Sequence, residues 1–165
     1  MNEHQLFLCL GGNLGNKAEI FSQTALLIGE RIGFLKKLSP VYSSPPWGFR
    51  ARSWFWNQVA EVTTVLAPEE VLREIQTIEH HFGRIRKPGG YRSRKMDIDI
   101  LFYDRLIMET PELTLPHPMI ARRLFVLLPL GDIAPKLVHP VTGEKIADMI
   151  AHTDDTSPVI RVSPS

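Results

Sequence analysis

Apolar residues recur along the chain with two periods, one typical of helices and one typical of strands. Between residues 17 and 32 they are spaced by three and four positions, which gives a helix one apolar face. The same spacing follows Pro68, whose missing N–H is tolerated in the first turn of a helix. Residues 96–100 instead alternate between apolar and polar, as in a half-buried strand. The whole pattern predicts strands at residues 6–10, 35–42, 55–66 and 96–103, and helices at residues 17–32, 68–82 and 121–128.

The order of these elements is strand, helix, strand, strand, helix, strand, with extra C-terminal elements. This is the split βαβ pattern of a ferredoxin-like α+β fold, in which an antiparallel sheet carries its helices on one face. We therefore expect the other face to be free to carry a site. At 165 residues the chain fits a single domain over residues 1–165, and the tail after about residue 151 is expected to be weakly ordered.

Composition and charge exclude several classes of protein. The formal net charge is +1, which argues against a general nucleic-acid binder or a membrane-surface binder. Cys9 is the single cysteine, so an intrachain disulfide and a multi-thiolate zinc site are excluded, and we interpret it as filler in a buried strand. The N-terminus is polar, and no apolar run approaches the roughly 18 residues that span a bilayer. We expect a cytoplasmic protein without a signal peptide, transmembrane helix, nucleic-acid partner or membrane partner.

The segment from Met96 to Phe102 is the most informative stretch. Strand alternation sends Asp97 and Asp99 to the same face, with Cα atoms about 6.6 Å apart. Two neighbouring carboxylates repel each other and need a counter-charge, which a pair of Mg²⁺ ions bound to substrate phosphates would supply. The alternative is a solvated strand face that happens to be acidic, and Asp-x-Asp alone does not exclude it.

A loop rich in glycine and basic residues precedes this strand, from Gly83 to Lys95. Its arginines match phosphate oxygens through their forked geometry, and the loop contains no acidic residue. Next to an acidic strand, this composition favours polyphosphate chemistry over a merely solvated run of charge. The basic residues of the loop are Arg84, Arg86, Lys87, Arg92, Arg94 and Lys95.

Three further features are weaker. The glycine-rich segment 11–17 lacks the glycine that a phosphate-binding loop has directly before its lysine, so a tight strand-to-helix turn is the better interpretation. His117 lies between two prolines, which suits a side chain held toward a phosphate, although a single histidine is more often structural. An aromatic slot with an amide would bind a flat heterocycle, but its members are equally compatible with core or surface positions. These members are Trp47, Trp54, Phe55, Asn57 and Phe125.

Taken together, these stretches resemble 6-hydroxymethyl-7,8-dihydropterin pyrophosphokinase of folate synthesis, over about residues 6–150. The strongest motif is Ser93-Arg94-Lys95-Met96-Asp97-Ile98-Asp99-Ile100-Leu101. The others, in the order of the family, are Leu10–Gly15, Tyr42–Gly48, Phe55-Trp56-Asn57, Leu66–Glu70, Gln76 with Glu79, Gly83–Lys87, Pro116-His117-Pro118, Arg122–Val126 and Pro129-Leu130.

The resemblance implies a ferredoxin-like fold and transfer of the β,γ-pyrophosphoryl group of ATP to the pterin hydroxymethyl group, with release of AMP. It implies two Mg²⁺ ions as cofactors, ATP and the pterin as small-molecule substrates, and we expect a monomer. By matching position, catalysis would rest on Arg84, Arg94, Asp97 and Asp99, the last two holding the metal. The ATP site would comprise Gln76, Glu79, Arg86, Ile100, Thr114, His117 and Arg123, and the pterin site Pro45, Trp47, Phe55, Asn57 and Phe125.

The sequence departs from the family at a few positions. Arg92 stands where a small residue is usual, Gly90 where a basic one is usual, and Glu112 where some members are basic. These departures bear on loop closure and single nucleotide contacts, not on the type of reaction.

Two alternatives share the same topology. A nucleotidyl transferase would also use the acidic strand, but it would release pyrophosphate instead of AMP and would not need the aromatic slot. An RNA-binding module would stack bases on the sheet, but Asp97 and Asp99 would repel phosphate there unless a metal were bound.

Overall fold

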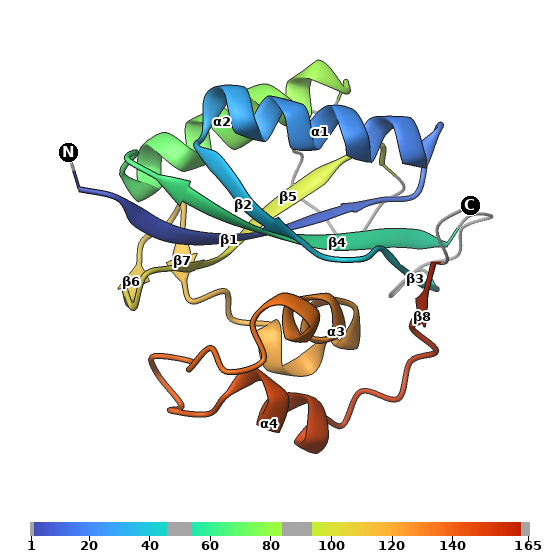
Figure 1. Ribbon diagram of the computed structural model, residues 1–165, viewed down its shortest axis with the longest axis vertical. Helices are drawn as coiled ribbons and strands as arrows, with labels where there is room; N and C mark the ends of the chain where they lie inside the picture. The colour runs from blue at the N-terminus through green and yellow to red at the C-terminus, as the bar shows by residue number, and fades with distance from the viewer. Residues whose placement is uncertain (1, 46–53, 84–93, 163–165) are drawn as a thin grey trace.

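The computed structural model describes residues 2–45, 54–83 and 94–162. In this part of the chain a twisted antiparallel sheet lies between two pairs of helices (Figure 1). The chain is therefore an α+β protein, as the sequence predicts. The elements are β1 His4–Gly12, α1 Lys17–Arg31, β2 Phe34–Leu38, β3 Tyr42–Ser44, β4 Phe55–Thr64, α2 Pro68–His81, β5 Asp97–Tyr103, β6 Met108–Glu109, β7 Thr114–Leu115, the 3₁₀ turn η1 Ile120–Arg122, α3 Leu124–Ile133, α4 Ile146–His152 and β8 Ile160–Arg161.

The strands lie in the order β5-β1-β4-β3-β8, and β2 pairs with β4 beside β3. All of these pairings are antiparallel. β1 is central: residue Cys9 faces Val59 of β4 on one side and Asp99 of β5 on the other. Side chains of the three strands therefore share one face of the sheet in register.

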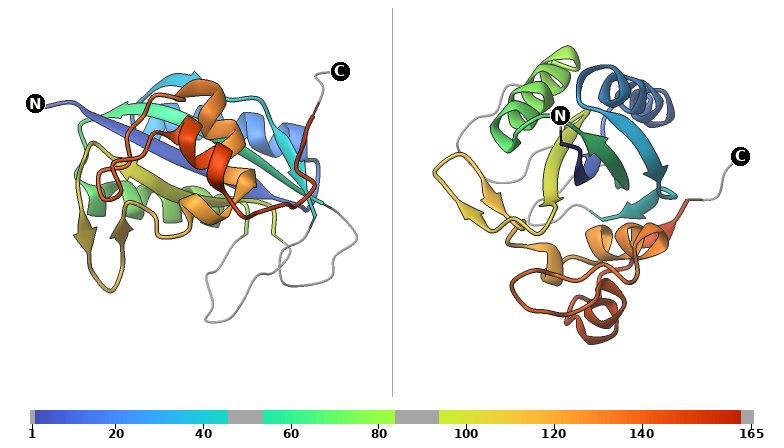
Figure 2. Two further views of the ribbon diagram at one scale, coloured as in Figure 1. Left: turned by 90° about the horizontal axis from the view of Figure 1, so that it is seen from below. Right: turned by 60° about the vertical axis from the view of Figure 1, so that its left-hand side comes forward.

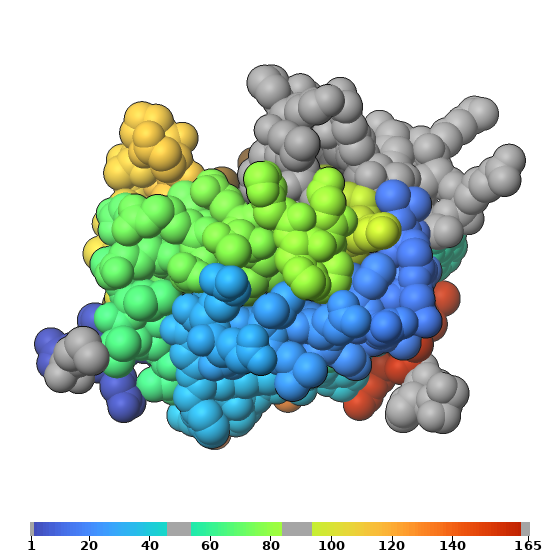
Figure 3. All heavy atoms as spheres, turned by 90° about the horizontal axis from the view of Figure 1, so that it is seen from above, coloured from blue at the N-terminus to red at the C-terminus, as the bar shows by residue number. Residues whose placement is uncertain are grey.

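One face of the sheet is covered by α1 and α2, as the sequence predicts. Their apolar stripes pack on alternate residues of the strands, including Leu8, Val62 and Ile98, which are at most 1% exposed. Each such buried side chain contributes about 1.5–3 kcal/mol through removal from water. Arg31 of α1 pairs with Glu74 of α2 at 3.1 Å, and Figure 3 shows the side chains of the two helices lying side by side over this face.

The opposite face, which was expected to be free, is free only in part. The helix α3 packs on it and α4 packs on the outer side of α3, as Figures 1 and 2 show, around a second apolar cluster. Phe7, Leu101 and Leu127 are central to this cluster and are at most 1% exposed. The helices cover one end of the face, and a site can be built at the other end.

The predicted strand at residues 35–42 is divided into β2 and β3. Pro40 has no N–H to donate to the ladder, so regular pairing stops at Ser39. The hydroxyl of Ser39 accepts a hydrogen bond from the Val59 N–H at 2.9 Å, and the Gln58 side chain donates to the Ser39 carbonyl at 2.8 Å. These two side chains replace ladder bonds and keep the strand halves aligned along β4.

The C-terminal third is more regular than its sequence pattern indicates. The helix predicted at residues 121–128 begins later, at Leu124, because Arg123 is extended (φ −132°, ψ 104°) and separates η1 from α3. The helix also continues through Pro129 to Ile133. The helix α4 and the short strands β6, β7 and β8 were not predicted. The tail after residue 151, expected to be weakly ordered, ends in β8 against β3.

An irregularity in the pairing of β1 with β5 accommodates one extra residue. Leu8 pairs with Ile100 and Phe7 with Phe102, so that Leu101 has no counterpart in the ladder. Such a bulge allows two consecutive residues to face the same side. Leu101 and Phe102 both belong to the cluster under α3, while Tyr103 returns to the cluster under α1 and α2.

Stability should fall in weak acid partly because of His139. Its ring packs edge-on against Phe102, and its Nδ1 accepts hydrogen bonds from the Val141 and Thr142 N–H groups. Burial lowers the pKa of His139, only partly opposed by Glu144. Below about pH 6.5 the unfolded chain therefore takes up a proton that the folded protein resists. Urea unfolding between pH 7.5 and 5 should show falling stability, and His139→Gln should fall less steeply; an unchanged slope in the variant would exclude this role.

Candidate active site

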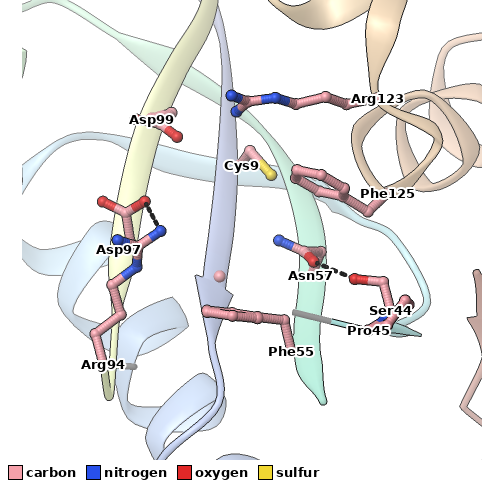
Figure 4. Close-up of a pocket in the computed structure, with 11 residues that line it drawn as sticks. Cys9, Ser44, Pro45, Phe55, Asn57, Arg94, Asp97, Asp99, Arg123 and Phe125 are labelled. Atoms are coloured by element: carbon pink, nitrogen blue, oxygen red, sulfur yellow. Dashed lines mark hydrogen bonds and ion pairs between the residues drawn. The ribbon is translucent and has the colours of Figure 1, made fainter. Parts of the chain in front are cut away.

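An open pocket of roughly 480 Å³ lies on the α3 side of the sheet, where β1, β4 and β5 run side by side (Figure 4). Its floor is set by register: Gly11 of β1 lies between Asp97 of β5 and Asn57 of β4. Alternate residues of the three strands point into it. The lining residues are Cys9, Gly11, Ser44, Pro45, Phe55, Asn57, Arg94, Asp97, Asp99, Arg123 and Phe125.

One side of the pocket is acidic. Asp97 and Asp99 both line it, while Ile98 and Ile100 point into the opposite core, so the predicted alternation is confirmed. A guanidinium nitrogen of Arg94 lies 3.3 Å from a carboxylate oxygen of Asp97, and the two side chains are 17% and 14% exposed. Partial burial strengthens this interaction, because there is less solvent to screen the charges.

The backbone of Arg94 is fixed to the turn after β1. Asn13, which is 2% exposed, accepts a hydrogen bond from the Arg94 N–H through its side-chain oxygen at 2.9 Å. The Asn13 N–H in turn donates to the Arg94 carbonyl at 2.9 Å. This pair of bonds places the arginine where its side chain reaches both Asp97 and the ring of Phe55, 5.6 Å from the ring centroid.

Two glycines of this turn are needed for close approach. A Cβ on Gly12 would lie 2.2 Å from the Lys95 carbonyl oxygen, so no side chain fits between β1 and the start of β5. A Cβ on Gly11 would lie 2.8 Å from the amide nitrogen of Asn57. The glycine-rich segment is thus a tight turn, as predicted, whose small residues bring the two sides of the pocket together.

The other side of the pocket combines aromatic rings with an amide. In Figure 4 the amide of Asn57 lies between the rings of Phe55 and Phe125. The Ser44 hydroxyl lies 3.5 Å from the Asn57 side-chain oxygen and orients the amide. Phe55 and Asn57 are only 8% and 6% exposed, so the slot is largely preformed.

Arg123 brings a second cation to the pocket from the residue before α3. Its guanidinium carbon lies 5.5 Å from the centroid of Phe125, and Figure 4 shows the side chain reaching across toward β5. Burial lowers the pKa of Arg123 from its usual range. Two arginines and two carboxylates therefore share one pocket with an aromatic slot.

The donor set of the pocket fits a hard divalent cation that is completed by its substrate. The described parts of the chain contain no group of three or more His, Cys, Asp or Glu residues able to hold a metal ion. Mg²⁺ does not require such a group, because it is commonly bound by one or two carboxylates together with water and substrate phosphates. Asp97 and Asp99 meet that requirement.

A sequence model of the 7,8-dihydro-6-hydroxymethylpterin-pyrophosphokinase (HPPK) family matches residues 7–135. The chain belongs to this family. A 2-amino-4-hydroxy-6-hydroxymethyldihydropteridine pyrophosphokinase of Porphyromonas gingivalis is 40% identical over 138 residues, which cover 82% of this chain and 93% of that protein. A protein of the same name from Bacillus subtilis is 34% identical over 138 residues, covering 83% of this chain and 82% of that protein.

Solved structures agree on the fold. A chain described as HPPK-DHPS in complex with substrates superposes with a TM-score of 0.74 at 16% identity and covers 92% of this chain. Wild-type HPPK-DHPS of Plasmodium falciparum with pteroate gives a TM-score of 0.72 at 18% identity and covers 91%. The present chain spans 43% and 42% of those two chains, respectively.

The structure brings eight described residues of the predicted HPPK site into one pocket. Arg94, Asp97 and Asp99 come from the catalytic set, and Pro45, Phe55, Asn57 and Phe125 come from the pterin set. Arg123, assigned to ATP by the resemblance, lines the same pocket. Trp47, Arg84 and Arg86 lie outside the described residues, and their roles stay predictions. Trp54 is 38% exposed and does not line the pocket.

The remaining residues predicted to bind ATP are placed elsewhere. Gln76 is exposed on α2, and Glu79 is buried, accepting a hydrogen bond from the Ile98 N–H at 2.9 Å. Ile100 belongs to the core under α1 and α2.

Thr114 is in β7, and the His117 N–H donates to the Leu101 carbonyl at 2.9 Å. Burial lowers the pKa of His117, against the opposing effect of Asp97. Their contacts with ATP stay predictions.

Sequence analysis missed the position of Cys9. It was interpreted as strand filler, and it is 4% exposed, but its side chain lines the floor of the pocket between Asn57 and Asp99. Burial, and then the charges of Asp99 and Asp97, raise the pKa of the Cys9 thiol, which keeps it neutral. Cys9 is two residues from Gly11 on β1, so both residues face the same side of the sheet. This spacing could have placed Cys9 in the pocket only if β1 were already known to lie between β4 and β5.

Proposed function

We propose that this chain transfers the β,γ-pyrophosphoryl group of ATP to the hydroxymethyl group of 6-hydroxymethyl-7,8-dihydropterin, in folate synthesis. One observation carries the proposal: a slot of two rings and an amide opens onto a pair of strand carboxylates flanked by arginines. HPPK membership supports this reaction over nucleotidyl transfer and over RNA binding.

In this proposal the pterin stacks between Phe55 and Phe125, and Asn57 pairs with its donor–acceptor edge. The slot then presents the hydroxymethyl oxygen toward the acidic side of the pocket. This oxygen bonds to the β-phosphorus of ATP, the bond from that phosphorus to the oxygen shared with the α-phosphate breaks, AMP leaves, and the hydroxyl proton is released.

The charged residues divide the work of binding the polyphosphate. Asp97 and Asp99 would hold two Mg²⁺ ions, which when bound neutralise the charge of the phosphates. Arg94, beside Asp97, and Arg123, which reaches toward β5, supply positive charge where negative charge increases during transfer. Arg84, in the basic loop, would act with them.

The proposal also includes the fold class, the cellular location, the oligomeric state and the partners of the enzyme. The strand order β5-β1-β4-β3, with β2 and β3 as halves of one strand, supports the ferredoxin-like class. None of the helices in the described ranges is long and apolar enough to cross a bilayer. We propose a cytoplasmic monomer that acts on small molecules and takes no nucleic-acid or membrane partner.

The test is product analysis by chromatography with protein, ATP, Mg²⁺ and the pterin. AMP and the pterin pyrophosphate should form in equal amounts, and only when the pterin is present. Release of pyrophosphate would point to nucleotidyl transfer instead. No pterin-dependent product from folded protein would reject the proposal, and strong salt-dependent binding of random RNA would favour the RNA-binding alternative.

Replacing Arg94 should reduce rate more than pterin affinity. Arg94→Ala removes a charge that faces the phosphates, and loss of one such group typically costs about 10²–10³-fold in kcat. Arg94→Lys keeps the charge but loses the fork, so it should be intermediate. Arg105→Ala, in an exposed turn away from the pocket, is the matched control. Lost pterin affinity in calorimetry with an unchanged kcat would show that Arg94 serves binding instead.

A further inference from the structure

The C-terminal segment 153–162 is attached to the walls of the pocket at both of its ends. It follows α4 and ends in β8 beside β3, as Figure 1 shows. The family match ends at residue 135, so this segment lies beyond it.

The first attachment is at the start of α3. A carboxylate oxygen of Asp155 accepts a hydrogen bond from the Leu124 N–H at 2.8 Å, and the Thr153 hydroxyl donates to the Ala121 carbonyl at 3.0 Å. Leu124 is the first residue of α3, and the helix has no capping side chain at its own N-cap, Arg123. The first N–H groups of a helix need partners from outside the helix, and a carboxylate suits the positive end of its dipole. Asp155 therefore supplies the cap that α3 lacks.

The capped turn carries two residues of the site. Arg123 and Phe125 flank Leu124, and both line the pocket. The backbone position of Leu124 therefore decides where their side chains lie. Burial alone would raise the pKa of Asp155, but hydrogen bonds from Ser157 and Leu124 outweigh it and lower the pKa, which favours the charged form that caps best.

The second attachment is at β3. Residues Ile160 and Arg161 pair with Ser43 and Tyr42 of β3, and the Val162 N–H donates to the Val41 carbonyl at 2.8 Å. β3 ends at Ser44 and Pro45 follows it, and both residues line the pocket. The segment thus spans from the Arg123–Phe125 wall to the Ser44–Pro45 wall.

The two walls are also joined directly. The Tyr42 hydroxyl donates to a carboxylate oxygen of Asp132 in α3 at 2.6 Å. Burial, reinforced by this bond, raises the pKa of Tyr42 to about 12, so the phenol stays protonated as a donor near neutral pH. β3, α3 and segment 153–162 are therefore joined to one another in a closed ring of contacts at the edge of the slot.

We propose that segment 153–162 sets the width of the pterin slot, with Asp155 as a positioning residue that acts through the first turn of α3. The inference rests on the proposed function, since it assigns the slot to the pterin. Loss of the cap lets the Arg123–Phe125 turn move away from Asn57. Pterin affinity then falls, while the acidic strand and its phosphate-binding role are unaffected.

The experiment compares Asp155→Ala with Asp154→Ala, which removes the same charge from the exposed neighbouring residue. Asp155→Ala should raise the calorimetric Kd and the KM for the pterin about tenfold, in line with the loss of a helix cap. It should raise the KM for ATP less than the KM for the pterin, because Arg123 moves with the turn while the acidic strand and Arg94 keep their places. Asp154→Ala should match the wild type, and Asp155→Asn, which keeps an acceptor oxygen, should restore most of the affinity.

A second readout separates a positioning role from general destabilisation. Hydrogen exchange at Leu124 to Val126 should accelerate in Asp155→Ala, while the amides of β1 and β5 keep their protection. Unchanged pterin affinity, or an equal loss for both substrates with lowered protection throughout, would overturn the inference. If Asp155→Ala does not fold, Thr153→Ala takes its place, because it removes the other hydrogen bond of this attachment. Unchanged pterin affinity in Thr153→Ala would overturn the inference equally. A wild-type protein that neither binds nor converts the pterin would instead reject the proposed function, whatever the exchange data show.

Discussion

Asp97→Asn and Asp99→Asn should each lower kcat by about three orders of magnitude or more while leaving the fold intact. Each change removes a carboxylate that would hold metal against the phosphates. Such charge stabilisation lowers the activation free energy by several kcal/mol, and about 1.4 kcal/mol corresponds to a tenfold change in rate. Steady-state rates at saturating ATP, pterin and Mg²⁺ measure the effect. Calorimetric titration with Mg²⁺ and a non-hydrolysable ATP analogue should show weakened binding in the same variants.

The control for these variants is Asp148→Asn, a change of the same chemistry on an exposed position of α4. It should leave both rate and binding unchanged. A near-normal rate in either pocket variant would contradict the assignment of the metal to β5. A comparable loss in the control would show that the effect is one of overall charge.

Gly12→Ala should destabilise the protein by about 3 kcal/mol, the upper end of the usual cost of overpacking. The added Cβ would meet the Lys95 carbonyl oxygen at 2.2 Å and its carbon at 2.9 Å, and backbone atoms cannot rotate away as a flexible side chain can. β5 and Arg94 would have to shift relative to β1, so activity should be lost together with stability. Urea denaturation at constant pH measures the first effect and the AMP assay the second.

Gly29→Ala is the matched control for this change. Gly29 lies in α1, and a methyl group added to it would meet nothing within 4 Å beyond the backbone of its own helix. Because alanine favours a helix over glycine by roughly 0.5–1 kcal/mol, this variant should be slightly more stable than the wild type. Equal stability of the two variants would show that the contact at Gly12 relaxes without cost.

The acidic strand could be predicted because strand periodicity is strong and local. The alternation from Met96 to Ile100 placed Asp97 and Asp99 on one face, and the structure confirms it. Phe55 and Asn57 share a face of β4 for the same reason. Their meeting with β5 in one pocket depends on the strand order, which places β1 between the two strands.

Features set by long-range contacts were beyond the local pattern. Seven residues of α4 give too short a pattern to recognise, and its helix is stabilised by packing of Ile146 and Met149 in the second core. The predicted helix ended at residue 128, but burial of Leu127 and Leu130 in the second core carries α3 on to Ile133. Pro40 in the sequence is consistent with the break between β2 and β3. The hydrogen bond from Gln58 across this break can be recognised only when the pairing with β4 is known.

The bulge in β5 gives the pocket a direction. On the α3 side of the strand, the carboxylates of Asp97 and Asp99 are followed at once by two apolar side chains, Leu101 and Phe102, which are 1% and 2% exposed. The extra residue doubles the apolar surface that β5 turns toward α3 at this point. Along β5, the acidic side of the pocket is therefore followed without a gap by the packed second core, so that charge and core share one strand.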